Sequence, residues 1–325
     1  MTHPDSLQSI FLERVKARLP ANVSFADELS ELLNISKDSA YRRMRGETIL
    51  SLGEAKILYD RYGISIDELF SSDSNMVTFH RRVVTYDAYD LNKWQNSILK
   101  NLEHLAGFAD KKLIFSAKDV PVFHYFRLPD LCRFKHFFWM KTLIGYPDYE
   151  KKKYTADAVP DSLVTTAQQV WKRYGSLPSS EIWNEEVIFD TLKQIEFYHE
   201  CNFFENPKEA IALCDQLSAL LNLVEAEAAQ GVKEFGGEFL LYKNEILISD
   251  NSVFAKMGDT RCVYVNQNAL NLLLTLQEPF CEQTEIYLNN LIAKSVLISK
   301  TAERERTRFF NNMKERIDFF KQRMK

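Results

Sequence analysis

Residues 29–46 read LSELLNISKDSAYRRMRG, and this stretch decides the fold of the first part of the chain. A short segment with helical spacing of apolar residues ends at Asn34, one of the few residue types besides glycine that tolerate a positive φ. Ser36 is a favourable N-cap for a following helix, and Gly46 is a favourable stop. The stretch therefore predicts two short helices joined by a tight turn, which is the layout of a helix-turn-helix.

The second of these helices is strongly basic. Lys37, Arg42, Arg43 and Arg45 fall within nine residues, whereas the whole chain has a formal net charge of −4. Residues 1–73 hold nine Lys or Arg and twelve Asp or Glu, so the positive charge is concentrated in one run. A focused basic patch on an acidic body suits a specific, salt-sensitive DNA reader that binds as two copies. The alternative is a solvated basic face on an interaction module.

Capping signals predict further short helices in the first seventy residues. Ser51 and Glu54 form a capping box, and Ser65 forms another with Glu68. Residues 6–19 have the apolar spacing of a helix. Together these signals predict a compact bundle of five helices that begin near residues 6, 24, 36, 51 and 65.

Residues 29–46 resemble the helix-turn-helix of the lambda-repressor/Cro family, and residues 51–70 resemble the last two helices of that family. The family pattern is matched without a gap at Leu29, Leu33, Ile35, Ser36, Ala40, Arg45 and Gly46. Two departures are Asn34, where glycine is usual, and Arg43, where a core side chain is common. The resemblance covers about residues 7–70, under a quarter of the chain. It implies a five-helix repressor-like bundle that binds double-stranded DNA, and we expect a homodimer.

The resemblance also implies roles for single residues. A recognition helix over residues 37–45 would lie in the major groove, where the N-terminal half of such a helix meets the base edges. The implied base-reading residues are Lys37, Asp38, Ser39 and Arg42. The residues expected to contact phosphates are Ser36, Arg43 and Arg45. Lys37 and Arg42 can donate to guanine, whereas Asp38 can accept from cytosine.

The whole chain is expected to be mainly α-helical, with an α+β C-terminal region. A polar break over residues 71–76 separates a DNA-binding domain of residues 1–72 from a mostly helical effector or oligomerisation region of residues 77–232. A glycine-rich segment marks a second boundary before residues 237–325, which predict a small antiparallel meander and a long C-terminal helix. The other expected helices are residues 91–109, 161–175, 181–200, 207–230 and 268–277, and the expected strands are 77–86, 113–126, 238–241, 246–249, 253–257 and 261–265.

Two patterns in this region leave alternatives open. Residues 126–140, FRLPDLCRFKHFFWM, are either helical core or the wall of a pocket for a flat ligand. His124 and His136 show no metal-ligand spacing and are expected to be core residues. Near the C-terminus, a heptad seam belongs to a dimer contact, to a basic helix near DNA or to a helix that packs on its own domain. The seam consists of Phe310, Met313, Ile317, Phe320 and Met324.

Signals of catalysis and of cofactors are absent from the sequence. It contains no GxGxxG, P-loop or HExxH motif, so we expect no catalytic residues, no cofactor and no metal site. Five cysteines without a C-x-x-C pair, and no apolar run long enough to span a membrane, favour a cytoplasmic protein. We therefore expect a sequence-specific transcriptional regulator whose C-terminal region dimerises and responds to a small-molecule or protein effector. The alternative is a protein–protein adaptor or ligand-sensing module without DNA binding.

Overall fold

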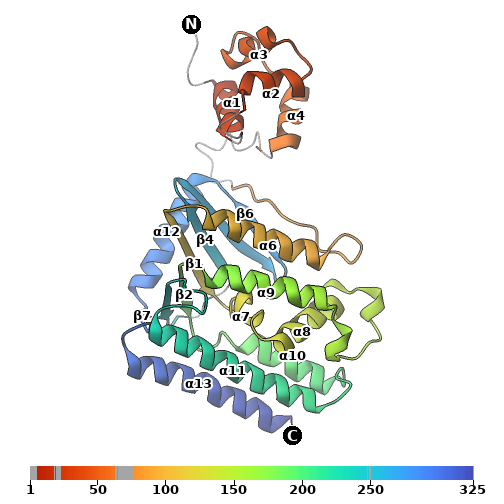
Figure 1. Cartoon of the computed structure of the whole chain (residues 1–325), viewed down its shortest axis with the longest axis vertical. Helices are drawn as coiled ribbons and strands as arrows, with labels where there is room; N and C mark the ends of the chain where they lie inside the picture. Colours follow the sequence, from red (N-terminus) through yellow and green to blue (C-terminus); the bar gives the residue numbers. More distant parts are fainter. Residues whose placement is uncertain are drawn as a thin grey trace. The chain divides into compact units, whose positions relative to one another are not determined.

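The structure is a computed structural model that describes residues 6–17, 19, 23–62, 64, 77–246, 248 and 250–324 (Figure 1). The chain divides into two compact units, Met1–Thr78 and Phe79–Lys325. The expected fifth helix, with its capping box of Ser65 and Glu68, lies outside the described residues. The expected linker over residues 71–76 lies outside them too.

In its described residues, the N-terminal unit contains four helices at positions that the sequence predicts. These are α1 (Leu7–Ala17), α2 (Phe25–Leu32), α3 (Lys37–Met44) and α4 (Leu52–Tyr62). Their apolar faces form one core, which includes the buried residues Phe11, Val15, Leu29, Ala40 and Leu58. Ala40 has no exposed surface, so its side of the short helix α3 packs on this core.

The C-terminal unit is built on a seven-stranded mixed sheet with the order β6-β5-β4-β1-β2-β3-β7. The strands are β1 (Lys111–Ala117), β2 (Ser179–Trp183), β3 (Phe239–Lys243), β4 (Ser252–Met257), β5 (Thr260–Asn268), β6 (Asn271–Thr275) and β7 (Val296–Leu297). The three strands β1, β2 and β3 run parallel in the middle. An antiparallel meander of β4, β5 and β6 extends one side, and β7 extends the other.

Helices cover both faces of this sheet. The helix α12 (Glu278–Ala293) covers one face, where Cys281 and Leu288 pack in a cluster with Ile114 and Phe254. The opposite face carries the larger core, to which all the other helices of the unit contribute (Figure 1). These helices are α6 (Leu91–Ala106), α7 (Val122–Tyr125), α8 (Pro129–Phe138), α9 (Asp161–Gly175), α10 (Phe189–Glu200), α11 (Lys208–Gln230) and α13 (Glu303–Arg323).

The chain is thus mainly helical with α+β character, as the sequence predicts, but one predicted helix is absent and another is wrong in part. Residues 268–277 form no helix, because Asn271–Thr275 is the strand β6, paired with β5. Residues 181–200 begin in the strand β2 and become helical only at Phe189. Short runs of apolar residues are compatible with both helix and strand, and here pairing with a neighbouring strand decides between them.

Two predicted strands also differ from the structure. Residues 113–126 are a strand only up to Ala117, and after Pro121 the chain turns into the short helix α7. Residues 77–86 form no regular strand and make one isolated bridge, between His80 and Leu274. The predicted strand at 246–249 includes positions that the structure does not describe.

The predicted boundary between residues 232 and 237 does not separate compact units. β1 and β2 precede it, β3 to β7 follow it, and all seven strands belong to one sheet. β3 pairs with β2 and so does not belong to the predicted meander. Gly237 serves close packing instead, because a Cβ at this position would lie 2.3 Å from the carbonyl oxygen of Leu177.

The aromatic block and the C-terminal seam are largely core. Phe126, Phe134 and Phe137 have no exposed surface, and His124 and His136 are buried as expected. The seam residues Phe310, Met313, Ile317, Phe320 and Met324 are buried as well, where α13 packs along α11 (Figure 1). The seam is therefore used inside the C-terminal unit, and its reading as a dimer contact is wrong.

Three further findings concern the described part of the chain. None of its helices is long and apolar enough to cross a membrane. Within the same ranges, no three His, Cys, Asp or Glu side chains are grouped so that they could hold a metal ion. The five cysteines are free, and all but Cys201 are buried.

The buried imidazole of His136 is held in its neutral form. Its Nδ1–H donates to the carbonyl oxygen of Cys132 at 2.7 Å, which leaves Nε2 to accept a hydrogen bond from the side-chain amide of Gln95 at 2.8 Å. Burial lowers the pKa of His136 to about 4. A second proton on this ring would place a charge in the core, where burial disfavours it.

We predict that the free energy of unfolding of the C-terminal unit falls as the pH is lowered from about 6.5 to about 4. In this window the unfolded chain binds a proton at His136 and the folded chain does not, which favours unfolding by up to roughly 3 kcal/mol. Urea unfolding at several pH values measures the slope. The variant His136→Phe, which cannot titrate at this position, should have a flatter slope, and an equal slope in both proteins would contradict the assignment.

Candidate functional site

The connection between α2 and α3 has the geometry that its sequence predicts. Asn34 has a φ of 51°, in the left-handed region that asparagine tolerates. Ile35 packs against the core of the N-terminal unit, and its N–H donates to the carbonyl oxygen of Ser30 at 3.0 Å. The hydroxyl of Ser30 returns a hydrogen bond to the carbonyl oxygen of Ile35 at 2.6 Å. Three adjacent contacts thus fix the angle at which the chain enters α3.

Ser36 and Gly46 mark the two ends of the α3 segment. The hydroxyl oxygen of Ser36 accepts from the backbone N–H of Ser39 at 3.2 Å, which is an N-cap, and it also lies 3.0 Å from the hydroxyl oxygen of Ser39. Gly46 has a φ of 74°, and its N–H bonds the carbonyl oxygen of Arg43 at 3.0 Å. The two serines therefore bind one another in the free protein, and Ser39 is half-buried.

Arg43 is directed into the N-terminal unit. Its guanidinium donates to the carboxylate of Glu54 at 2.7 Å and to the carbonyl oxygen of Ser39 at 3.2 Å. The side chains of Arg43 and Glu54 are each only 15% exposed. Glu54 also accepts from the N–H of Ser51 at 2.8 Å, which completes the predicted capping box. One carboxylate therefore holds both the end of α3 and the start of α4.

The same contacts favour the ionised form of the Glu54 carboxyl group. Burial alone would raise the pKa of this carboxyl, but the Ser51 N–H and the Arg43 guanidinium bind its ionised form and hold the pKa below its usual value.

Gln8 on α1 connects this helix to the segment that follows α3, a contact that the sequence did not reveal. Its amide donates to the carbonyl oxygens of Arg43 at 2.9 Å and Thr48 at 2.8 Å, and its oxygen accepts from Leu50 N–H at 2.8 Å.

The three remaining bases of the segment are exposed, and each is paired with a nearby carboxylate. Lys37 lies 2.6 Å from Asp27, with 68% of its side chain exposed. Arg42 is 58% exposed and lies 3.2 Å from Asp38, one helical turn before it. Arg45 makes a two-pronged contact with Glu47, at 2.7 and 3.1 Å, and the guanidinium lowers the pKa of that carboxyl.

These exposed pairs are weak in water. Surface ion pairs contribute between zero and about 1 kcal/mol, because solvent screens them and both side chains lose freedom. The pairs of Lys37, Arg42 and Arg45 can therefore open at little cost when a stronger anion approaches. The pair of Arg43 and Glu54 differs, since breaking it leaves each of two largely buried charges without the other. The structure thus leaves three bases available for a ligand and commits the fourth to the fold.

The C-terminal unit contains a cavity of about 580 Å³ between α6 and the sheet. Its lining includes apolar side chains from α6, β1 and β4 and from the aromatic block, among them Trp94, Ile98, Phe115, Val253, Ala255 and Trp139. The aromatic block, expected to be either core or pocket wall, therefore contributes to both. Pockets of this size, lined mainly by apolar groups, are the usual form of small-molecule sites.

Lys135 lies at one end of this cavity and is almost fully buried. Its ammonium donates to Thr191 Oγ1 at 2.9 Å and Gln194 Oε1 at 3.0 Å, and it lies 3.5 Å from Asp119 Oδ2. It also lies 4.3 Å from the ring centre of Tyr125. Burial lowers the pKa of Lys135, against the opposing effect of Asp119. The ammonium is thus satisfied by its own neighbours.

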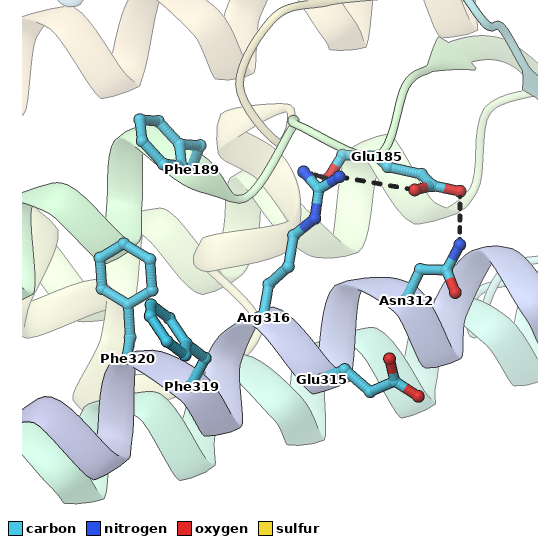
Figure 2. A pocket seen from close by; sticks show the side chains of 7 residues that line it. All are labelled: Glu185, Phe189, Asn312, Glu315, Arg316, Phe319 and Phe320. Atoms are coloured by element: carbon cyan, nitrogen blue, oxygen red, sulfur yellow. Dashed lines mark hydrogen bonds and ion pairs between the residues drawn. The ribbon is translucent and has the colours of Figure 1, made fainter.

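A second hollow lies on the surface of α13 (Figure 2). In it, Arg316 and Asn312 both reach Glu185, with the Asn312 amide at 2.8 Å from the carboxylate. The aromatic rings of Phe189, Phe319 and Phe320 line the other part. These contacts tie α13 to the segment that follows β2, and the hollow is open to solvent.

Glu181 on β2 is a buried acid that the sequence did not single out. It accepts from Nε2 of His124 at 3.0 Å and from the indole N–H of Trp183 at 2.8 Å, and the hydroxyl of Tyr174 also donates to it. Burial alone would raise the pKa of Glu181, but His124, the ammonium of Lys233 and the hydroxyl of Tyr174 together outweigh that effect and lower it. None of these five side chains lines the cavity, so the cluster holds the core together.

No protein-family model, curated protein or solved structure matches the chain. Two features of the structure bear on function, the exposed bases of α3 and the cavity between α6 and the sheet.

We predict that Arg43→Ala destabilises the N-terminal unit by about 1–3 kcal/mol, because it removes charge-assisted hydrogen bonds and leaves the largely buried carboxylate of Glu54 without its guanidinium partner. Arg42→Ala should change its stability by less than about 0.5 kcal/mol, because Arg42 is exposed. Hydrogen exchange of peptides from α3 and α4 in the full chain measures both values. Equal protection in the two variants would show that Arg43 does not hold α3 in place.

Proposed function

We propose that the chain is a sequence-specific, DNA-binding transcriptional regulator, with a repressor-like helix-turn-helix bundle of five helices at its N-terminus. One observation carries the proposal. A short helix, held at a fixed angle by Asn34 and Glu54, presents Lys37, Arg42 and Arg45 to solvent on a unit that is otherwise acidic. A protein with no anionic ligand would have little use for so much ordering of one basic helix.

In this proposal α3 enters the major groove. Lys37 and Arg42 face the base edges and donate to guanine, with Asp38 and Ser39 beside them. Arg45 and the N-cap Ser36 contact phosphates. Arg43, which the resemblance allowed as a phosphate contact, is assigned to the fold, since its guanidinium is bound to Glu54. Asp38 and Arg42 lie one helical turn apart, so Asp38 orients the arginine before DNA binds.

DNA binding then proceeds by exchange of partners. Each exposed base leaves a protein carboxylate and binds a base edge or a phosphate. The released carboxylates Asp27, Asp38 and Glu47 remain near the DNA and oppose its negative charge. This opposition keeps non-specific affinity low, because non-specific binding rests on phosphate neutralisation alone. It suits a homodimer that places two recognition helices in successive half-sites.

The alternative function is an adaptor in which the N-terminal unit binds another protein. Ile49 and Leu52, just after the basic segment, are 83% and 84% exposed, and apolar side chains so placed can contact a protein partner. We favour DNA because three exposed bases gather on one short helix that is capped at Ser36 and held by Glu54, whereas only two exposed apolar side chains lie beside it. In keeping with a transcriptional role, we propose a cytoplasmic location.

We predict that Arg42→Ala weakens binding to an operator selected from random DNA by about 5- to 150-fold, which corresponds to about 1–3 kcal/mol for one lost guanine contact. Fluorescence anisotropy of labelled operator DNA measures the affinity. Lys56→Ala is the matched control, because Lys56 forms an exposed pair with Asp60 at the same spacing on α4. Equal affinity of the Arg42→Ala variant and the unaltered protein in low salt would refute the proposal and favour the adaptor.

We predict that Glu47→Gln has the opposite effect and raises affinity for the same operator about two- to tenfold, because it frees Arg45 and removes a charge that repels phosphate. Asp60→Asn, which removes the carboxylate of the α4 pair, is the control and should change affinity less. A weaker affinity after Glu47→Gln would mean that Glu47 orients Arg45 toward DNA and does not compete with it.

A further inference from the structure

The cavity in the C-terminal unit is formed by the face of the sheet that carries α6. Along β4, Val253 and Ala255 line the cavity, whereas Phe254 between them packs under α12. The alternation of side chains across the sheet thus sets which residues reach the cavity. Trp94 and Ile98 on α6 close it from above, four residues apart on one face of the helix. An apolar body of moderate size fits between these two walls.

The charged groups around the cavity are unevenly paired. Four Lys or Arg side chains and two Asp side chains line it, a net formal charge of +2, whereas the whole chain carries −4. These are Arg81, Arg82, Lys118, Lys135, Asp119 and Asp190. Lys135 lies 3.5 Å from Asp119, so that the buried pair is internally balanced. The excess positive charge therefore lies with the side chains at the rim.

Arg82 is one of the exposed basic residues at the rim, and its backbone is held by two hydrogen bonds. Its backbone N–H donates to Asn271 Oδ1 at 3.2 Å, and its carbonyl oxygen accepts from Asn271 Nδ2 at 2.8 Å. Burial raises the pKa of Tyr264 on the cavity wall, and the charge of Arg82 opposes that effect, so the guanidinium lies within electrostatic range of the wall. Among the described residues, this guanidinium has no hydrogen-bond or ion-pair acceptor, although its backbone is anchored on both sides.

We infer that this cavity binds an amphipathic monoanion, with its apolar body between α6 and the sheet and its anionic group at the guanidinium of Arg82. A carboxylate is the anion that matches the planar fork of an arginine with two parallel hydrogen bonds. Because Arg82 is exposed, a neutral ligand would leave its guanidinium to water and gain nothing from it, and a cationic ligand would meet the net positive rim. The ligand therefore supplies the counter-charge that the protein does not.

Arg82 also links the cavity to the first unit along the chain. It belongs to residues 79–89, which begin the C-terminal unit directly after the boundary at Thr78. This segment is held to β6 by two backbone hydrogen bonds between His80 and Leu274, at 2.7 and 2.9 Å. A ligand bound at Arg82 thus contacts the segment that leads along the chain to the first unit. An effect of this contact on DNA binding rests on the proposed function, whereas ligand binding itself does not.

The first experiment measures ligand binding by calorimetry on the full chain without DNA. Decanoate and 2-naphthoate present a flexible and a flat apolar body, and decan-1-ol and 2-naphthol are their uncharged counterparts. At least one carboxylate should bind about tenfold or more tightly than its counterpart. Arg82→Gln should abolish this preference, whereas Arg308→Gln, on the exposed face of α13, should keep it. Which body binds more tightly tells whether the ligand is chain-like or flat.

Two variants that fill the cavity test its location. Ala255→Ile from the sheet side and Ser97→Leu from the α6 side should each weaken the carboxylate and its counterpart alike. Circular dichroism shows which variants keep the fold. The inference is overturned if neither carboxylate binds, if the counterparts bind equally well, if Arg82→Gln keeps the preference, or if neither folded filling variant weakens binding.

The second experiment adds operator DNA. A saturating amount of the tighter carboxylate should change operator affinity at least about threefold in the unaltered chain and not in Arg82→Gln, in the range of ordinary allosteric coupling. If the carboxylate binds as predicted but no DNA is bound at all, the proposed function fails and the ligand site stands. If DNA binds and no carboxylate does, the reverse holds.

Discussion

The carboxylate of Glu54 is the contact on which the N-terminal unit depends. It accepts from the Ser51 N–H, where α4 begins, and from the guanidinium of Arg43, near the end of α3. A single side chain thus fixes two helices relative to each other, from a position that is only 15% exposed. The turn at Asn34 fixes the other end of α3. With both ends held, a helix of only two turns can present side chains at defined positions.

That constraint divides the four bases into two kinds. Arg43 is used to hold the helix, and Lys37, Arg42 and Arg45 are left exposed with exchangeable carboxylate partners. Under the proposed function, the acidic balance of the unit would be a source of selectivity, because attraction to phosphate alone is partly cancelled within the protein. The C-terminal unit shows a related pattern, in which buried charges are paired and the excess positive charge lies at the rim of the cavity.

Local signals in the sequence are sufficient to predict the four helices that the structure describes in the N-terminal unit. The caps at Ser36 and Ser51 and the turn at Asn34 act over three or four residues and can be recognised without the fold. The role of Arg43 could not be predicted so, because its partner lies eleven residues away on another helix. The departure from the family pattern at this position was the one available hint.

The strands of the sheet are predicted poorly because their partners, like that of Arg43, are distant in the chain. β2 and β6 are strands only because distant segments pair with them, and their apolar runs would suit a helix equally well. Gly237 allows two chain segments to approach closely, and the sequence alone does not distinguish such a glycine from one at a domain boundary. The cavity lies among α6, the aromatic block and four strands, so no single stretch of sequence could reveal it.

We propose above all that α3 reads DNA sequence. The direct test is selection of bound sequences from a random double-stranded library, with the full chain in low salt. We expect enrichment of an inverted repeat whose half-sites lie about one helical turn apart, with a guanine in each half-site that is no longer selected by the Arg42→Ala variant. Failure of the unaltered chain to enrich any sequence over the starting library would contradict this proposal.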